Sequence, residues 1–264
     1  MFFGERMKWK KFGIRLKHGI IIGIDSAVSR RLDVLEPFFG RQFTFKQKTM
    51  NPSKTCRIKQ LEIGPMQNYI YLVGDPVSRQ AAVVDPAWDV GTIVAEARRD
   101  DWQIACILLT HGHPDHTEGV SELQAAYPVP VYLSRDEPDL LTPTCRDLRR
   151  TVPGQNIAVG RLEITCLPTP GHSPGSQCYL CDPVLLTGDT LFIRGCGRCD
   201  LPGGDARALY HSLYDIILSL PGTTRVYPGH RYGPAPDMTL DELKQVNPYL
   251  QFRSERDFIQ AMGM

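Results

Sequence analysis

The residues best suited to chemistry lie in one short segment, Thr110-His111-Gly112-His113-Pro114-Asp115-His116. It places three imidazoles and a carboxylate within six residues. Side chains of this kind are the usual ligands of zinc and of non-haem iron. Clustering them this tightly is unfavourable unless a cation holds them together, so the segment predicts a metal site.

Further Asp and His residues follow later predicted strands, namely His172, Asp189 and His230. Strand ends are where a sheet presents converging side chains from a rigid base. A lone histidine is more often a structural residue, but five of the seven histidines of the chain belong to this combined set. The clustering therefore favours metal binding.

The spacing predicts two sets of ligands. His111 and His113 are two residues apart, so in an extended segment their imidazoles face the same way and can chelate one ion. Asp115 and His116 lie at the start of a following helix and can reach a second ion, while the two oxygens of Asp189 can bridge both. In addition to the shared Asp189, the first predicted set contains His111, His113 and His172, and the second contains Asp115, His116 and His230.

The elements that must position these residues are mostly strands. Short β-rich runs predict an antiparallel meander over 57–63, 69–73 and 81–84. A continuous apolar run at 104–109 predicts a buried strand that ends where the histidine cluster begins. A helix at 121–127 and a strand at 129–133 follow, and turn-bounded runs predict further strands at 157–159, 162–167, 177–181, 184–186 and 225–227.

Three more helices are predicted. Residues 90–99 have helical apolar spacing. Residues 206–218 form the clearest helix, with Asp205 as its cap, and residues 239–246 begin with Thr239 and Glu242 in capping-box spacing.

Charge divides the chain into two parts. Residues 1–55 carry 12 Lys/Arg and 4 Asp/Glu, whereas residues 56–264 carry 18 and 25, so the main body is acidic. An acidic body argues against nucleic acid as a partner, because that binding depends on neutralising phosphates. We expect a catalytic domain at 56–264 after a basic extension at 1–55, which is either a segment without fixed structure, a membrane-surface lead, or a start assigned too early with Met50 as the true one.

Cysteine usage and hydropathy bear on the compartment. Eight cysteines in a chain of 264 residues, with no secretory signal, predict a reducing cytoplasm rather than a disulfide framework. The apolar runs, such as those at 20–22 and 104–109, are too short to span a bilayer, so no stable membrane insertion is expected.

Two cysteine pairs, Cys178/Cys181 and Cys196/Cys199, superficially match a zinc ribbon. We expect the match to be accidental, because residues three apart in a strand face opposite sides. The first pair is interpreted as small buried hydrophobes. A redox or persulfide role stays open for the second pair, which lies in a glycine-rich loop.

These motifs together resemble the metallo-β-lactamase superfamily over roughly Arg57 to Leu250. The motif of residues 111–116 is the specific signature, and Pro170-Gly171-His172, Thr187-Gly188-Asp189-Thr190 and Tyr227-Pro228-Gly229-His230 follow in the family's order. The resemblance implies an α/β (α+β) fold, the four-layer αββα sandwich, with the metal site along one edge of the two sheets.

The resemblance also implies roles. Metal one would take His111, His113 and His172, and metal two Asp115, His116 and His230, with Asp189 and a hydroxide bridging. Asp115 and Asp189 would be the catalytic carboxylates beside that nucleophile. Two divalent ions are implied, with zinc as the first candidate and iron or manganese as alternatives. Their charge would activate water and polarise a carbonyl.

Within the superfamily the chain is similar to the glyoxalase II-like branch, whose members hydrolyse S-acylglutathione thioesters. The similarity rests on residues 188–192, the loop 196–205 and the ending Asn247-Pro248-Tyr249-Leu250. Only 34 residues follow His230, too few for the extra helical domain that helps to bind glutathione there. The resemblance thus implies a small-molecule thioester substrate, with a glutathione conjugate as the first candidate, and leaves the oligomeric state open, a dimer included.

The rival branch is the persulfide dioxygenases, which bind one Fe(II). Their loop is similar to Ile193-Arg194-Gly195-Cys196-Gly197-Arg198, and iron would take His111, His172 and Asp189. Gly112 stands where the dioxygenases typically have cysteine and Cys199 where they have threonine, which favours the hydrolase. A non-catalytic metal-binding module is a third alternative, disfavoured because all seven ligand positions are present.

Four residues near the predicted site are candidates for substrate binding. Their guanidinium groups could meet a carboxylate such as that of glutathione, and the tyrosine could line the mouth of the site. A purely structural role is the competing interpretation for each of them: Arg194, Arg198, Arg231 and Tyr232.

Overall fold

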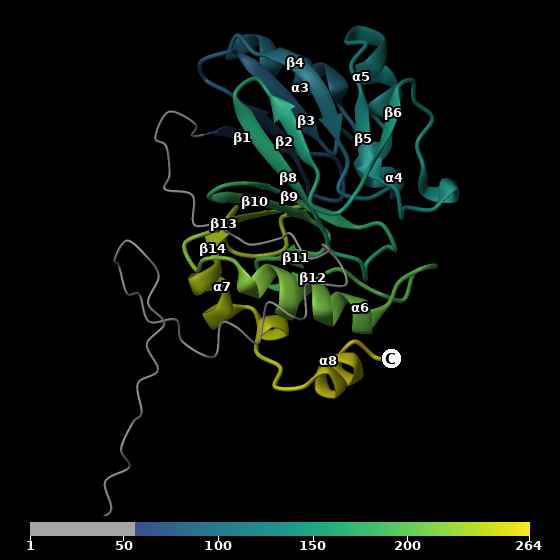
Figure 1. Cartoon of the computed structure of the whole chain (residues 1–264), viewed down its shortest axis with the longest axis vertical. Helices are drawn as coiled ribbons and strands as arrows, with labels where there is room; N and C mark the ends of the chain where they lie inside the picture. The colour runs from purple at the N-terminus through teal and green to yellow at the C-terminus, as the bar shows by residue number, and fades with distance from the viewer. Residues whose placement is uncertain (1–55) are drawn as a thin grey trace, which may run out of the picture.

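The computed structural model describes residues 56–264, and the predictions made for residues 1–55 lie outside the described residues. Two six-stranded sheets make up most of this part (Figure 1). The first sheet has the strand order β1 (Arg57–Ile63), β2 (Asn68–Gly74), β3 (Gln80–Val84), β4 (Gln103–Leu108), β5 (Val131–Ser134) and β6 (Leu148–Thr151). The second has the order β14 (Met238–Thr239), β13 (Arg225–Pro228), β10 (Val184–Gly188), β9 (Gln177–Cys181), β8 (Leu162–Pro168) and β7 (Asn156–Val159).

Helices cover the outer faces of the two sheets (Figure 1). Beside the first sheet lie α3 (Val90–Arg99), α4 (Pro114–Thr117) and α5 (Val120–Ala126). Beside the second lie α6 (Ala206–His211), α7 (Leu240–Val246) and α8 (Glu255–Ala261). A two-stranded sheet of β11 (Leu191–Phe192) and β12 (Gly195–Cys196) lies between the second sheet and α6.

Three apolar layers hold this arrangement together. Alternate residues of β2 point to opposite sides, so Tyr71 packs between the sheets while Leu72 packs under α3 and α5. The second sheet is buried on both faces in the same way, with Leu185 packed against Leu209 of α6. The predicted four-layer αββα sandwich is confirmed.

Local sequence signals place several element ends where we expected them. The first three strands pair as an antiparallel meander, and β4 pairs in parallel with β5 across α5. Asp205 caps α6 by accepting from the amides of residues 207 and 208. Thr239 and Glu242 form the predicted capping box of α7.

Other elements differ from prediction. The helix expected over 206–218 is α-helical only to His211 and continues as a π-helix at Ser212–Ile216 and a 3₁₀ turn at Ile217–Ser219. The change begins at Ser212, whose hydroxyl donates to the Pro170 carbonyl at 2.6 Å. Neither β6 nor α8 was predicted, because apolar and polar residues do not alternate clearly in β6 and because α8 is short.

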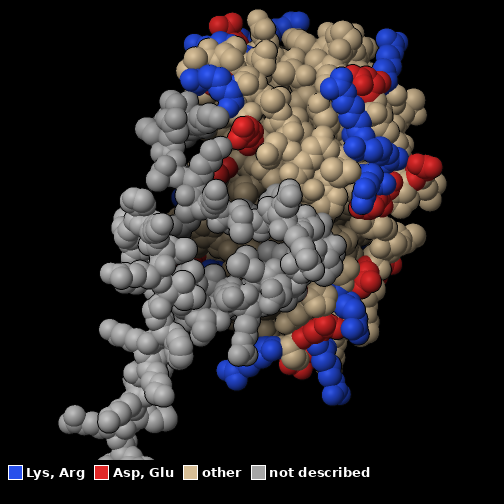
Figure 2. Space-filling model, viewed as in Figure 1, with Lys and Arg blue, Asp and Glu red and all other residues tan. Residues whose placement is uncertain are grey.

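The surface carries both signs of charge. On the described part of the face in Figure 2, Lys/Arg and Asp/Glu side chains lie close together around a broad uncharged area, without a continuous positive surface. No helix within residues 56–264 is long and apolar enough to cross a membrane.

Candidate metal centre

The predicted ligands all follow strands that end at one edge of the sandwich. His111 and His113 follow β4, and His116 lies in α4. His172 follows β8, Asp189 directly follows β10, and His230 follows β13. Because β4 and β13 run parallel to their neighbours β3 and β10, these carboxyl ends meet at the same edge.

The first group contains three imidazoles, those of His111, His113 and His172. Their nearest ring nitrogens lie within 4.8 Å of one another, and His113 Nδ1 is 2.9 Å from His172 Nε2. His111 Nε2 is buried and has no hydrogen-bond partner among the described residues. Three converging imidazole nitrogens, one of them buried without a hydrogen-bond partner among the described residues, are suited to a cation.

The second group contains Asp115, His116 and His230. His116 Nε2 lies 3.2 Å from His230 Nε2, and Asp115 Oδ2 lies 3.4 Å from each of them. Both histidines are only 1% exposed, so neither can be satisfied by bulk water. These atoms too could hold one ion.

Asp189 lies between the two groups. Its Oδ1 is 3.3 Å from His116 Nε2, and its Oδ2 is 3.4 Å from His230 Nε2 and 3.6 Å from His172 Nε2. Oδ1 is buried and makes no hydrogen bond to any described residue. Burial works to raise the pKa of Asp189, but the neighbouring histidines outweigh it and hold that pKa well below the ordinary value. The carboxylate is therefore placed to be shared by two ions.

The remaining ring nitrogen of most of these histidines is already occupied, which fixes the orientation of each ring. The partners are a hydroxyl, a carboxylate and two backbone carbonyls, at 2.8 to 3.1 Å. They pair as follows: His111 with Thr110 Oγ1, His116 with Asp85 Oδ2, His172 with the Arg198 carbonyl and His230 with the Met66 carbonyl.

Comparison with known proteins identifies the family. The family model described as the metallo-beta-lactamase superfamily matches residues 63–230, well over half of the chain. The chain belongs to the metallo-β-lactamase superfamily. Among solved structures, ETHE1 from Myxococcus xanthus is similar with a TM-score of 0.71 and 32% identity, over 78% of this chain and 90% of that one.

Relatives within the superfamily carry different names. The chain is 38% identical to a probable polyketide biosynthesis zinc-dependent hydrolase, BaeB, of Bacillus velezensis, over 73% of this chain and 85% of that protein. It is 40% identical to a hydroxyacylglutathione hydrolase of Alkalilimnicola ehrlichii, over 70% of each. It is also 33% identical to the mitochondrial persulfide dioxygenase ETHE1 of Homo sapiens, over 74% and 76%. These relatives and the ligand groups together support a metal-dependent hydrolase, without defining its substrate.

Three polar residues hydrogen-bond to the candidate ligands or to their loops but were not identified from the sequence. Asp85 could itself count as a ligand beside His111 and His116, but its carboxylate already accepts from the Thr110 amide and hydroxyl at 2.8 and 2.6 Å. Its position at the end of β3 was the available signal. The other two, Asn68 and Glu137, lie at a strand start and in a loop, where no motif marked them.

The four predicted substrate residues have different surroundings. Arg198 forks onto Asp200, and Arg231 pairs with Glu62 at 3.3 Å. The exposed Arg194 guanidinium has no partner within residues 56–264. The Tyr232 ring is stacked on His230, with centroids 4.8 Å apart, and is 42% exposed. Of the four, Tyr232 is thus the one whose side chain packs on a candidate ligand.

The cysteines are all unpaired, and none joins a candidate metal group among the described residues. As expected, Cys178 and Cys181 face opposite sides of β9 and pack in different apolar layers. Burial raises the pKa of Cys199 to about 12. That thiol is protonated at neutral pH, which argues against the redox role left open for it.

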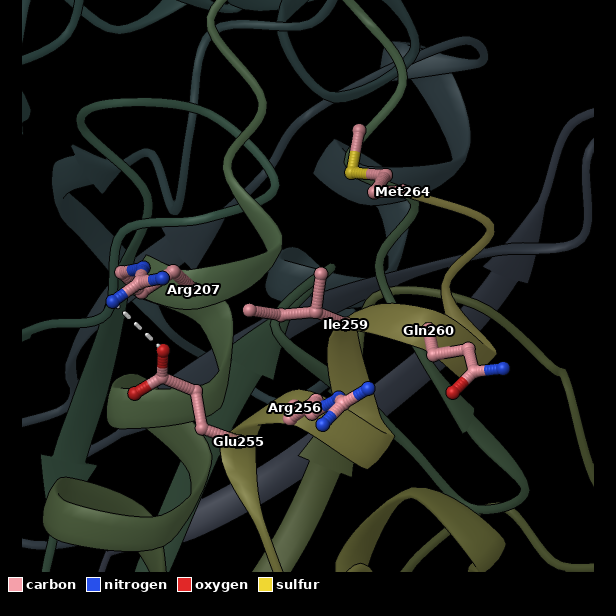
Figure 3. A pocket seen from close by; sticks show the side chains of 6 residues that line it. All are labelled: Arg207, Glu255, Arg256, Ile259, Gln260 and Met264. Atoms are coloured by element: carbon pink, nitrogen blue, oxygen red, sulfur yellow. Dashed lines mark ion pairs between the residues drawn. The ribbon is translucent and has the colours of Figure 1, made fainter.

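A separate surface hollow lies between α6 and α8 (Figure 3). An ion pair of 2.9 Å between Arg207 and Glu255 crosses it. It contains none of the predicted site residues, being lined by Arg207, Glu255, Arg256, Ile259, Gln260 and Met264.

Zinc binding to the second group is expected to release protons. Burial works to lower the pKa of His116, but three nearby carboxylates, Asp189 foremost, outweigh it and hold that pKa well above the ordinary value. Against the same effect of burial, Asp115 and Asp189 raise the pKa of His230 to about 9. Both pKa values lie above 7, so zinc must displace protons to bind here, and its affinity should rise as the pH increases to 9.

Calorimetry at pH 7 in two buffers of different ionisation enthalpy measures this release. One of the two zinc equivalents should release more protons than the other. The other equivalent is an internal control, since burial lowers the pKa of His111 and His113 and leaves them neutral. Equal release by both equivalents would contradict the prediction.

Proposed function

We propose that this protein is a thioesterase that uses two divalent metal ions to hydrolyse a thioester of the S-acylglutathione kind. Zinc is the first candidate for these ions. One observation carries the proposal: Asp189 lies within 3.6 Å of ring nitrogens from both ligand groups. A site with two complete groups and a shared carboxylate is suited to hydrolysis, which uses a pair of cations. The hydroxyacylglutathione hydrolase of A. ehrlichii, at 40% identity, supports this choice of substrate.

The metals would supply an activated water and polarise the thioester carbonyl. His111, His113 and His172 would hold one ion, and Asp115, His116 and His230 the other, with Asp189 between them. The chain's own contribution is to fix most of these side chains before substrate arrives, because the outer ring nitrogens of four histidines are already bonded: His111, His116, His172 and His230. Tyr232 and Arg194 are proposed to line the mouth and meet the polar part of the substrate.

The second candidate is a mononuclear Fe(II) persulfide dioxygenase, favoured by the 33% identity to human ETHE1. The surroundings of Gly112 favour the hydrolase. A Cβ placed there would lie 1.8 Å from the Leu141 carbonyl oxygen, so the cysteine typical of dioxygenases does not fit in this conformation.

Metal content and two assays decide between the candidates. We expect protein grown without metal supplements to carry two divalent ions per chain and to hydrolyse an S-acylglutathione such as S-lactoylglutathione. A pantetheine thioester of the same acyl group tests whether glutathione itself is recognised. One iron per chain, together with oxygen uptake on glutathione persulfide, would overturn the proposal in favour of the dioxygenase.

We also propose a cytoplasmic location and a free small-molecule substrate rather than nucleic acid. Eight unpaired cysteines are suited to a reducing compartment. The acidic balance of residues 56–264 supports the exclusion of nucleic acid.

A further inference from the structure

Glu137 is a buried carboxylate outside the predicted ligand set. It lies in the loop after β5 and is 2% exposed. Its Oε1 accepts from the Gly112 amide at 2.7 Å, and its Oε2 accepts from the Ser173 hydroxyl and the Gly175 amide, both at 2.8 Å. All three neighbours donate, which matches a group that only accepts.

The three donors belong to the two loops that carry the first ligand group. Gly112 separates His111 from His113, and Ser173 directly follows His172. The Glu137 side chain therefore bonds to two loops, one from each sheet, at the point where each loop presents its histidines. Losing a group that orients metal ligands typically weakens metal affinity by about 10–100-fold.

The loop that carries Glu137 is packed tightly against both ligand loops. A Cβ at Gly112 would lie 1.8 Å from the Leu141 carbonyl oxygen, and a Cβ at Gly175 would lie 2.3 Å from the Glu137 amide nitrogen. From the other side, the Arg150 guanidinium of β6 donates to the Ser134 and Glu137 carbonyls, both at 3.0 Å. The carboxylate is thus held in place by the sheet behind it.

The second ligand group is supported by other residues. Asn68 Nδ2 donates to the Asp115 carbonyl at 2.9 Å and to Asp115 Oδ2 at 3.1 Å, while Asn68 Oδ1 accepts from the Trp88 indole. Asp85 orients His116. Glu137 has no hydrogen bond to any member of this group, so its own contacts serve the first group alone.

We infer that Glu137 is a positioning residue for the first metal position: it clamps the loop of His111 and His113 to the loop of His172, and it does not support the second position. The inference rests on the proposed ligand assignment but not on the proposed substrate. It also holds for a single iron on His111, His172 and Asp189, because the same two loops carry both histidines.

The test uses Glu137→Gln, which replaces one acceptor oxygen with an NH₂ donor that faces at least one of the three donors. Zinc affinity is measured on the full-length metal-free protein by competition with a chromophoric chelator, without substrate. We expect one of the two equivalents to weaken by about 10–100-fold and the other to stay unchanged. Ser173→Ala removes only one donor and should weaken the same equivalent by a smaller factor, which keeps the test available if Glu137→Gln does not fold.

Two background variants show which position is affected. In His230→Ala, where only the first position is complete, Glu137→Gln should still weaken the remaining equivalent. In His113→Ala, where only the second is complete, it should have no effect. Asn68→Ala should show the opposite pattern. An unchanged affinity in the His230→Ala background would overturn the inference.

Asp75→Asn is the matched structural control. Asp75 is also a fully buried carboxylate, accepting from the Arg161 guanidinium at 2.9 Å, but it follows the other end of β2, away from the site. It should lower the thermal midpoint and leave both zinc affinities unchanged. A loss of zinc affinity in Asp75→Asn equal to that in Glu137→Gln would show general destabilisation and refute the clamp. A wild-type protein that binds one ion would instead count against the proposed two-metal function alone, since the clamp is measured on the first position.

Discussion

Replacing Asp189 with alanine is expected to abolish both metal retention and thioester hydrolysis. Asp189 approaches ring nitrogens of His116, His172 and His230, so its loss removes a ligand from both positions at once. Removing a group that merely orients a ligand costs about 10–100-fold in metal affinity, and removing a shared ligand should cost more. Purified Asp189→Ala should therefore contain little metal by elemental analysis and show only background turnover.

Two further variants separate this effect from misfolding. Asp189→Asn keeps the shape of the side chain but not its charge, and we expect the same loss of metal with a smaller change in thermal midpoint. Asp200→Ala removes an exposed carboxylate of the neighbouring loop, where it pairs with Arg198, and should leave metal content unchanged. An Asp189→Ala protein with wild-type metal content and rate would refute the shared-ligand assignment.

The convergence of the candidate ligands could be predicted from the sequence because they occur in short motifs at strand ends. A buried strand such as β4 reads as a continuous apolar run, and the polar residues directly after it are at the sheet edge. Strands of the same sheet that run in parallel end at the same edge, so separate motifs could be assigned to one place before any contact was known. The helix caps at Asp205 and Thr239 were predictable for the same local reason.

Residues whose role depends on distant neighbours could not be predicted in this way. Glu137 lies 25 residues from Gly112 and 36 from Ser173, in a loop without a pattern. Asn68 lies 47 residues from Asp115. In both cases the side chain has ordinary sequence surroundings, and only the packing of the two sheets reveals that it is buried among donors or beside a ligand.

The predicted roles of the arginines show the same limit at shorter range. Arg198 and Asp200 are two residues apart, and from the sequence either substrate binding or a structural role was open for Arg198. The structure pairs them, so substrate binding by Arg198 would require this pair to open. At exposed positions such pairs contribute little stability, and the competition with a substrate carboxylate is decided by geometry.

Gly112→Ala is expected to produce the largest loss of stability of any substitution proposed for this site. Its Cβ would lie 1.8 Å from the Leu141 carbonyl oxygen and 2.8 Å from the Leu141 Cβ, so the loop must move away. That movement combines overpacking with loss of the hydrogen bond from the Gly112 amide to Glu137, a total of about 2–5 kcal/mol. Urea unfolding of the metal-free protein measures the change directly.

Gly195→Ala is the matched control for this glycine. It lies in β12, and the nearest atom to an added Cβ is Phe192 Cδ2 at 3.7 Å, an ordinary contact. Its unfolding free energy should change by less than about 1 kcal/mol. Gly112→Cys adds a functional readout, since it introduces the residue typical of the dioxygenase branch. If Gly112→Cys unfolds like wild type and retains its metal, the loop yields easily, and the close approach of Leu141 no longer distinguishes hydrolase from dioxygenase.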